Sequence, residues 1–247
     1  MFSSLKFIFL TFCLVTFSAV GQDIATVDKK TILTGLHKPP YVIEYSDSGI
    51  QLDLVRTAFK GTKYGFSFVH IPFGRGALGF QQFNADGVLT LPESFKAPAM
   101  YLSQPYIEYQ NVAVSLVDNN FTIKQLSDLS GKSVTAFQKA ELYLGKEYQQ
   151  AVEATSHYRE IPEQKKQIEL LFLNRTDVIV LDINILKYYL KNYVNREIAK
   201  PFTVHFIFDK SPYSLGFRSE AMRDVFDQNI KKMKENGTYQ VIVDKYL

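Results

Sequence analysis

The sequence predicts an α/β fold of two lobes, each a mainly parallel sheet flanked by helices. Short apolar strands alternate with helical stretches, and this alternation begins again after a turn-rich segment at 127–131. Such alternation is typical of parallel sheets. The chain has 247 residues, 46% hydrophobic and 21% charged, which are the proportions of a globular protein with a sizeable core. Two α/β units joined by extended segments indicate two lobes rather than one large domain.

In the first unit, alternating or continuous apolar residues predict strands, and apolar residues three and four apart predict helices. The expected elements are a strand at 32–36, a helix at 50–59, a strand at 66–71, a helix at 76–83, and strands at 86–91 and 112–117. Pro39 and Pro40 interrupt the chain after the first strand, because proline fixes φ and lacks an amide donor. Gly61 is expected to end the first helix.

The second unit repeats this order. We expect a strand at 133–137, helices at 140–154 and 163–173, a strand at 177–181, a helix at 183–193, a strand at 213–217, and helices at 219–235 and from there to the end. The run at 177–181 is continuously apolar, which is typical of a strand buried on both faces. Asn236-Gly237 is expected to separate the last two helices.

The first 21 residues have the pattern of a secretory signal. Lys6 precedes an apolar run at 7–20, and the small residues Ala19 and Gly21 precede a cut before Gln22. The run is about 14 residues long, short of the roughly 20 that span a membrane. We therefore expect export and cleavage, and the alternative is an uncleaved anchor.

The single cysteine, Cys13, lies within this apolar run. Phe12 precedes it and the apolar run continues after it, so the pattern does not favour a lipid anchor. The cleaved chain of about 226 residues would contain no cysteine, which excludes disulfides, thiol catalysis and cysteine-based metal sites.

Charge and motifs exclude several functions. The chain has 28 Lys plus Arg and 25 Asp plus Glu, and a net charge of +3 is too small to predict nucleic-acid binding. The four histidines do not have metal-site spacing, and the sequence has neither a nucleophile elbow nor a nucleotide-binding loop. We therefore expect no cofactor, no metal and no enzymatic activity.

Polar and aromatic residues near strand ends are the candidate binding residues, because ligands of α/β sheets bind outside the carboxyl ends of the strands. The candidates are Lys38, Tyr41, Phe73, Arg75, Thr90, Ser94, Lys96, Phe137 and Asp182. Arg75 could grip a carboxylate or be a solvated surface residue. Asp182 could cap the helix that follows it or bind an ammonium group. Tyr41 and Phe73 could sandwich a ligand or pack in the core.

Four stretches resemble the family 3 extracellular solute-binding proteins, the polar amino-acid binding components of bacterial ABC importers. They are 39–41 with 49–54, 101–106, 177–182, and 236–239 with 245–247. The first is similar to the family's "PPF … G-[FI]-x-x-D-L" pattern and the second to its "F-S-x-P-Y" pattern. The third is similar to "D-A-V-V-x-D" and the fourth to "D-G-T-Y-x-x-I-x-x-K-Y".

The resemblance implies the type II periplasmic binding protein fold, with two hinge strands and a ligand closed between the lobes. It places a discontinuous first lobe at 22–108 and 210–247 and a second lobe at 109–209. It also implies a periplasmic monomer that captures a small polar ligand, amino-acid-like or a small carboxylate, for ABC-type uptake. In the family, the residue matched by Asp182 binds the ligand's ammonium group.

Three stretches depart from the family pattern, and one of them is Thr90-Leu91-Pro92-Glu93, which stands where the family has a threonine-rich tract. Lys96 stands where the family usually has a carboxylate-binding arginine, and lysine lacks the bidentate fork. Lys139-Ala140 replaces a "G-T" turn. Our hypothesis is that Arg75 or Lys96 binds the anionic end of the ligand. Two other functions remain open: a sensory binding protein without an importer, and a dehydratase-like enzyme using Asp182, Glu93 or His37 as acid or base.

Overall fold

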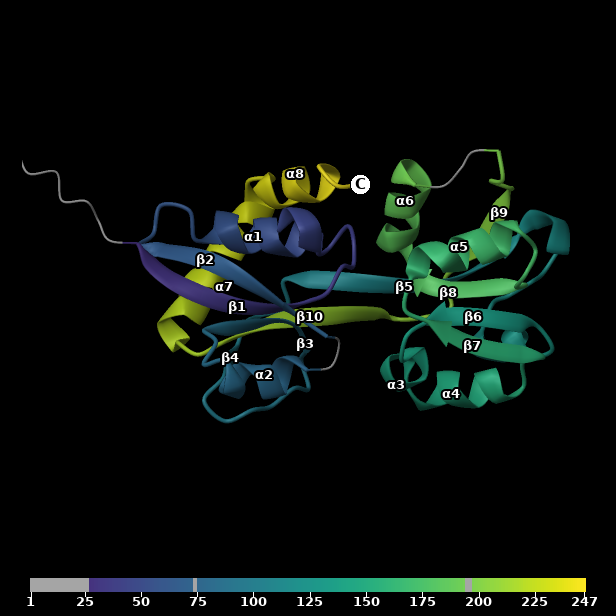
Figure 1. The fold of residues 1–247 in the computed structure, drawn as a ribbon, viewed down its shortest axis with the longest axis horizontal. Helices are drawn as coiled ribbons and strands as arrows, with labels where there is room; N and C mark the ends of the chain where they lie inside the picture. Colours follow the sequence, from purple (N-terminus) through teal and green to yellow (C-terminus); the bar gives the residue numbers. More distant parts are fainter. Residues whose placement is uncertain (1–26, 73–74, 194–196) are drawn as a thin grey trace, which may run out of the picture.

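The computed structural model describes residues 27–72, 75–193 and 197–247, which form two α/β lobes side by side (Figure 1). The expected signal segment at 1–21, with Cys13, and the candidate Phe73 lie outside the described residues. Within the described ranges, no helix is long and apolar enough to cross a membrane.

The first lobe is built on a sheet in which β1 lies between β2 and β3 and runs parallel to both. Helix α1 covers one face of this sheet and α2 the other, while α7 and α8 return from the end of the chain to pack on α1 (Figure 1). The elements are β1 (Asp28–Gly35), α1 (Ile50–Ala58), β2 (Tyr64–Ile71), α2 (Gly76–Gln82), β3 (Gly87–Pro92), β4 (Tyr101–Leu102), α7 (Glu220–Glu235) and α8 (Thr238–Asp244).

The second lobe repeats this plan, with β6 between β7 and β8 and parallel to both. Helices α5 and α6 lie on one side of the sheet, and α3 and α4 lie on the other (Figure 1). The elements are β6 (Ser133–Phe137), α3 (Ala140–Leu144), α4 (Lys146–Glu153), β7 (His157–Ile161), α5 (Gln164–Phe172), β8 (Val178–Asp182), α6 (Ile183–Asn192) and β9 (Phe202–His205).

Two long antiparallel strands, β5 (Ile107–Leu116) and β10 (Lys210–Phe217), join the lobes. Residues 107–110 of β5 pair with residues 210–213 of β10. Beyond this crossing, β5 pairs with β8 and β9 in the second lobe, and β10 pairs with β3 and β4 in the first. The two hinge strands expected from the sequence are therefore confirmed.

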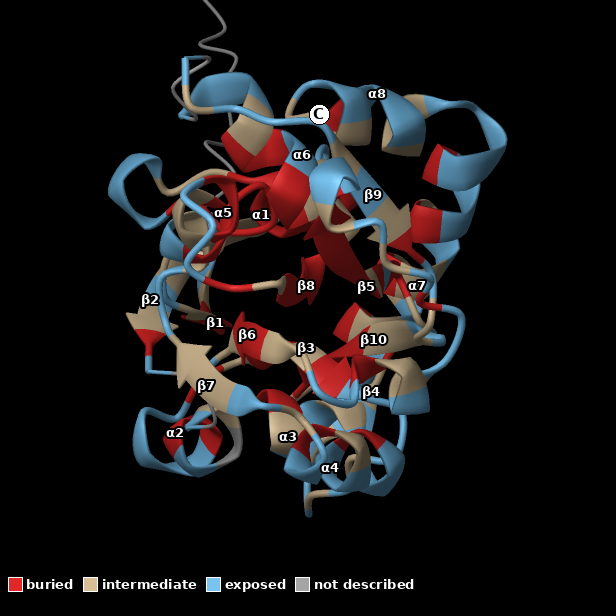
Figure 2. Ribbon diagram, turned by 90° about the vertical axis from the view of Figure 1, so that its right-hand side faces the viewer, coloured by how far each residue is buried: buried red, intermediate tan, exposed pale blue. Residues whose placement is uncertain are grey.

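Buried side chains line the central strands and the inward faces of the helices (Figure 2). All five residues of β8 are buried, as its continuous apolar run predicts. In α1 the buried residues include Ile50, Leu54 and Ala58, four positions apart, which place one face of the helix on the sheet. Helices packed on both faces of each sheet hold the strands in place. They therefore fix the positions of the strand ends at the junction of the two lobes.

The sequence-based assignment did not predict β4, began β5 five residues late, and was wrong in three further places. The single helix expected at 140–154 is two helices, because Gly145 adopts φ 86° and ψ −178°, which no helix can contain. Strand β7 was missed because its polar, half-buried residues lack the alternation of a strand with one buried face. Strand β9 was missed because it contributes only four residues.

Gly49 holds the loop after β1 against the start of α1. Its φ is 122°, and an added Cβ would lie 2.5 Å from the carbonyl oxygen of Tyr41. The amides of Ile50 and Gln51 donate to the carbonyls of Pro40 and Tyr41 at 2.9 and 3.1 Å. This close approach of two backbones needs a residue without a side chain.

Gly49→Ala should therefore lower the free energy of unfolding by about 2 kcal/mol, because the new methyl group meets rigid backbone and φ is unfavourable. Gly35→Ala is the matched control, since a Cβ there has nothing within 4 Å. Urea unfolding of both variants measures the difference, and equal stabilities would contradict this account.

Candidate functional site

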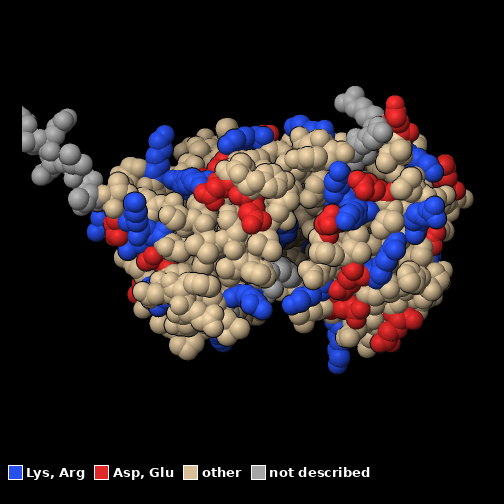
Figure 3. All heavy atoms as spheres, in the orientation of Figure 1, with Lys and Arg blue, Asp and Glu red and all other residues tan. Residues whose placement is uncertain are grey.

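Four of the sequence-predicted residues meet where the two lobes join. Lys38 and Tyr41 come from the loop after β1, Thr90 from β3, and Asp182 from the end of β8. The surface is hollowed between the lobes, with Lys and Arg side chains on both sides of the opening (Figure 3). Tyr109 of the hinge strand β5 lies among the four residues, and we call these five the polar cluster.

Asp182 is the centre of the polar cluster. Its Oδ1 accepts from the amides of Asn184 and Ile185 at 2.9 and 3.1 Å, so it caps α6. The Tyr41 hydroxyl donates to the same oxygen at 2.9 Å, and the Gln110 amide donates to Oδ2 at 2.8 Å. Burial raises the pKa of Asp182 and these four hydrogen bonds oppose the rise.

The aromatic part of the cluster stacks on the hinge. The Tyr41 and Tyr109 rings are 4.1 Å apart between centroids and inclined by 25°, and Tyr213 of β10 meets Tyr109 edge-on at 4.9 Å. Tyr41 is 1% exposed, so its ring packs in the core. Its hydroxyl is nevertheless part of the polar cluster, because it donates to Asp182. Tyr109 was missed from the sequence, although it lies at the expected boundary between the lobes, at 108–109.

Lys38 brings a positive charge into this aromatic environment. Its Nζ lies 4.4 Å from the centroid of the Tyr109 ring, within cation–π range. Loss of hydration lowers the pKa of Lys38 from 10.5 to about 8, while the negative charge of Asp182 pulls it upward. The protein therefore holds an ammonium group that is poorly hydrated.

Thr90 has an unusual backbone conformation. Its φ is 61°, an outlier for a β-branched residue, and it lies at a bulge where the pairing of β3 with β10 shifts register. The bulge directs its Oγ1 to the side-chain amide of Gln51, 3.0 Å from Nε2 and 3.1 Å from Oε1. Strain of this kind is concentrated at functional sites. The sequence-based prediction also missed Gln51, which is buried in α1. A polar residue between the apolar residues Ile50 and Leu52 was the sequence signal that could have indicated a functional side chain.

The Tyr109 hydroxyl is buried without a hydrogen-bond partner among the described residues. It lies near Thr90 but not in hydrogen-bond geometry with it. Burial raises the pKa of Tyr109 well above its usual value, so the hydroxyl remains a donor. A buried donor of this kind costs free energy unless something else binds it.

The other sequence-predicted residues are not joined to the polar cluster by any contact among the described residues. Arg75, Ser94 and Lys96 are exposed on the first lobe. Phe137, at the end of β6, is half-buried and packs on the second-lobe core. The structure thus unites Lys38, Tyr41, Thr90 and Asp182 but leaves Arg75, Ser94, Lys96 and Phe137 outside the cluster.

At the start of α3, the backbone amides are occupied by an internal carboxylate. The Lys139 and Glu141 amides donate to Glu160 at 2.6 and 3.0 Å, and the Tyr158 hydroxyl donates to it at 2.9 Å. Lys139 itself has φ 62°, the conformation for which the sequence pattern of relatives uses glycine. The backbone amides of Lys139 and Glu141 are therefore bound by Glu160.

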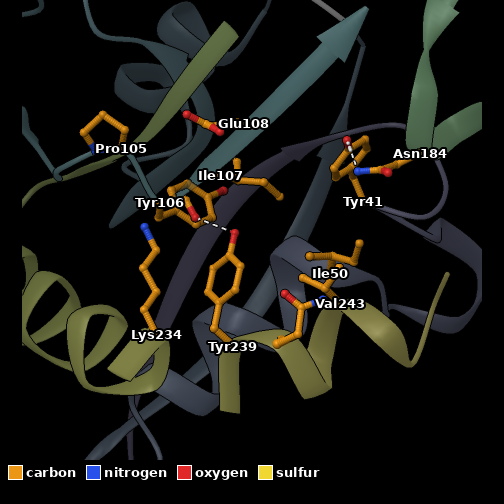
Figure 4. A pocket seen from close by; sticks show the side chains of 11 residues that line it. Tyr41, Ile50, Pro105, Tyr106, Ile107, Glu108, Asn184, Lys234, Tyr239 and Val243 are labelled. Carbon is orange, nitrogen blue, oxygen red and sulfur yellow. Dashed lines mark hydrogen bonds between the residues drawn. The ribbon is translucent and has the colours of Figure 1, made fainter. Parts of the chain in front are cut away.

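A second hollow, of about 320 Å³, lies beside β5, α7 and α8 (Figure 4). Tyr239 donates to the Tyr106 carbonyl at 2.8 Å in its wall, and Lys234 and Glu108 lie at its edge. Of the sequence-predicted residues only Tyr41 lines it. This hollow therefore shares Tyr41 with the polar cluster but none of its other described members.

Acid–base and metal chemistry are not supported by the geometry. Among the described residues, no group of three or more His, Cys, Asp or Glu could hold a metal. His37 bonds to the Tyr45 hydroxyl at 2.5 Å, Glu93 is exposed, and Asp182 is fully hydrogen bonded. These three residues do not form a paired acid and base.

No protein-family model matches the chain. Among solved structures, an ancestral arginine-binding protein bound to arginine superposes with a TM-score of 0.68 at 21% identity, over 89% of this chain and 98% of its own. An ABC uptake transporter substrate-binding protein from Streptococcus pneumoniae with bound histidine gives 0.67 at 16% identity, over 89% and 92%. An ancestral amino-acid-binding protein, a precursor of cyclohexadienyl dehydratase, gives 0.63 at 20% identity, over 88% and 94%.

These likenesses cover nearly the whole of each protein and establish the fold. The chain has the type II periplasmic binding protein fold, as the sequence resemblance implied.

Lys38→Met should raise the free energy of unfolding at pH 7 by about 2 kcal/mol, because it removes a poorly hydrated ammonium. The folded-state pKa, about 8, lies below the unfolded value of 10.5. The cost of the charge is therefore complete below about pH 8 and disappears as the pH approaches 10.5.

Urea unfolding of the variant and the wild type should show a gap at pH 7 that narrows near pH 10. Lys232→Met, at an exposed lysine of α7, is the control and should show no comparable gap. A destabilised Lys38→Met protein at pH 7 would contradict the argument.

Proposed function

We propose that this protein is a solute-binding protein that captures a small polar ligand, amino-acid-like or a small carboxylate, in the cleft between its lobes. One observation carries the proposal: charged and aromatic side chains from the first lobe, the hinge and the second lobe converge at one point. Lys38 comes from the first lobe, Tyr109 from the hinge strand β5, and Asp182 from the second lobe. Clefts between domains lined by aromatic and a few polar groups are favoured binding sites.

Binding would act through closure of the lobes about β5 and β10. We propose lobes at 22–108 with 210–247, and at 109–209, because β5 and β10 are the strands that pass between them. A ligand that touches both lobes stabilises the closed form by the contacts made only there. Pairing between the two strands keeps the hinge continuous while each lobe moves as a unit.

We further propose that the protein is periplasmic and delivers its ligand, as a monomer, to an ABC permease. The signal-like segment at 1–21 supports export, and the likeness to the Streptococcus pneumoniae substrate-binding protein supports uptake. A sensory role without an importer uses the same cleft. An adjacent permease and ATPase gene would favour uptake, and an adjacent sensor kinase gene would favour signalling.

A dehydratase-like enzyme is the second candidate, and the likeness to a dehydratase precursor favours it. The geometry weighs against it, because Asp182 is buried and bound by four donors. Binding without turnover is the expected result when purified protein is incubated with its ligand and the mixture is followed by NMR. Repeated turnover would instead assign an enzyme.

A thermal-shift screen of the mature protein against amino acids, small carboxylates and amines should identify a ligand. At a concentration about 100 times its dissociation constant, a ligand of the folded state should raise the melting temperature by about 5 to 10 °C. Small-angle scattering should then show a smaller radius of gyration with the ligand than without it. A ligand that stabilises the protein without compaction would contradict closure.

Arg75 and Lys96 are proposed to bind the anionic end of the ligand as the lobes close. Arg75→Ala and Lys96→Ala should each fold normally, since both residues are exposed, and at least one should weaken binding about tenfold or more. Isothermal titration with the identified ligand measures this. Unchanged affinity in both variants would exclude the two residues from the site.

A further inference from the structure

The carboxylates that border the cleft are already occupied by the protein itself. A carboxylate accepts about four hydrogen bonds. Asp182 receives four, from Tyr41, Gln110 and two amides of α6. Three of these bonds end on Oδ1 and one on Oδ2, and Asp182 is only 2% exposed, so a ligand ammonium could reach the remaining lone pair of Oδ2 only by displacing the side chains that cover it.

Glu160 is occupied in the same way. Two amides at the start of α3 and the Tyr158 hydroxyl donate to its carboxylate. These amides are consequently unavailable to a ligand carboxylate as well. The ammonium group of an amino acid would therefore not find a free acceptor at Asp182 or Glu160. Its carboxylate would not find free backbone amides at the start of α3.

The groups that the polar cluster offers are donors. The Lys38 ammonium has three N–H donors, so it can keep its protein neighbours and still bind a ligand. The Tyr109 hydroxyl is a second donor, buried and unpaired among the described residues. Lys38 lies over the face of the Tyr109 ring, which brings the two donors together. Such a pair matches the oxygen atoms of an anion.

We propose that the ligand is a small organic carboxylate without an ammonium group, whose carboxylate binds Lys38 and the Tyr109 hydroxyl and, once the lobes close, also Arg75 or Lys96. The proposal rests on the proposed function of the cleft and specifies its ligand class. The stacked rings of Tyr41 and Tyr109, with Tyr213 edge-on to Tyr109, give the site an apolar wall, which favours an organic acid over an inorganic anion. Its negative charge would lie beside the poorly hydrated ammonium of Lys38.

Matched pairs of compounds that differ only by an ammonium group test the proposal. The pairs are 3-phenylpropionate with L-phenylalanine, succinate with L-aspartate, and glutarate with L-glutamate, with inorganic phosphate and a simple amine as further probes. Isothermal titration of the mature protein should find at least one carboxylate that binds about tenfold or more tightly than its amino acid.

The outcomes separate the ligand class from the function. An amino acid that binds as tightly as its matched carboxylate overturns the proposal and leaves the solute-binding function intact. Binding of phosphate or the amine alone also overturns it. If no compound of the thermal-shift screen or of these pairs binds, the proposed function fails and the ligand class fails with it.

Two variants assign the contacts. Lys38→Met should weaken carboxylate binding about 10- to 100-fold, and the exposed Lys232→Met is its matched control. Tyr109→Phe removes only an unpaired hydroxyl, so it should weaken carboxylate binding several-fold without lowering the melting temperature of the free protein. Loss of stability in Tyr109→Phe together with unchanged affinity would show a structural hydroxyl and overturn its proposed role.

Discussion

The carboxylate of Asp182 is the contact on which the arrangement of the two lobes depends. It caps α6 of the second lobe, accepts from the hinge strand at Gln110, and accepts from Tyr41 of the first lobe. Asn184 adds a second link by donating to the Tyr41 hydroxyl at 3.1 Å. One buried acid thus fixes three separate parts of the chain, and the geometry of the cleft follows from it.

This use of Asp182 determines what else the site can hold. A buried carboxylate with four donors has little capacity left, so the charged group of the cluster that can still bind a ligand is the Lys38 ammonium, which has three N–H donors. The fold tolerates that charge at some cost in stability, and the unpaired Tyr109 hydroxyl adds to the cost. Costs of this kind are typical of binding sites, where groups are arranged for a partner rather than for the free protein.

Most of the fold could be predicted from the sequence because strand and helix periodicities are local. Residues such as Gly61 and Asn236-Gly237 mark helix ends through local backbone chemistry, and the structure ends α1 and α7 close to them. The short polar strand β7 and the break at Gly145 could not be read in this way. For β7, pairing with β6 overrides a weak local pattern.

The site was predictable only in part. Lys38, Tyr41, Thr90 and Asp182 follow strand ends, where ligands are expected, and the structure brings them together. That Asp182 would be saturated depends on Gln110 and Tyr41, which are 72 and 141 residues away along the chain. No local pattern reports such contacts, and the orphaned hydroxyl of Tyr109 is visible only once its neighbours are placed.

The contacts between the lobes lie on one side of the cleft, so the lobes can close only from the opposite side. Tyr41, Asp182 and Asn184 join the lobes near α6, and Lys191 donates to the terminal Leu247 at 3.0 Å on the same side. The opening is on the side of α2 and α3, with basic side chains on both of its edges (Figure 3). Like charges that approach one another repel, so closure without a ligand is opposed. An anion held between the edges attracts both of them, so the electrostatic energy then favours closure. The anion makes more contacts in the closed form than in the open form, and this stabilises the closed form.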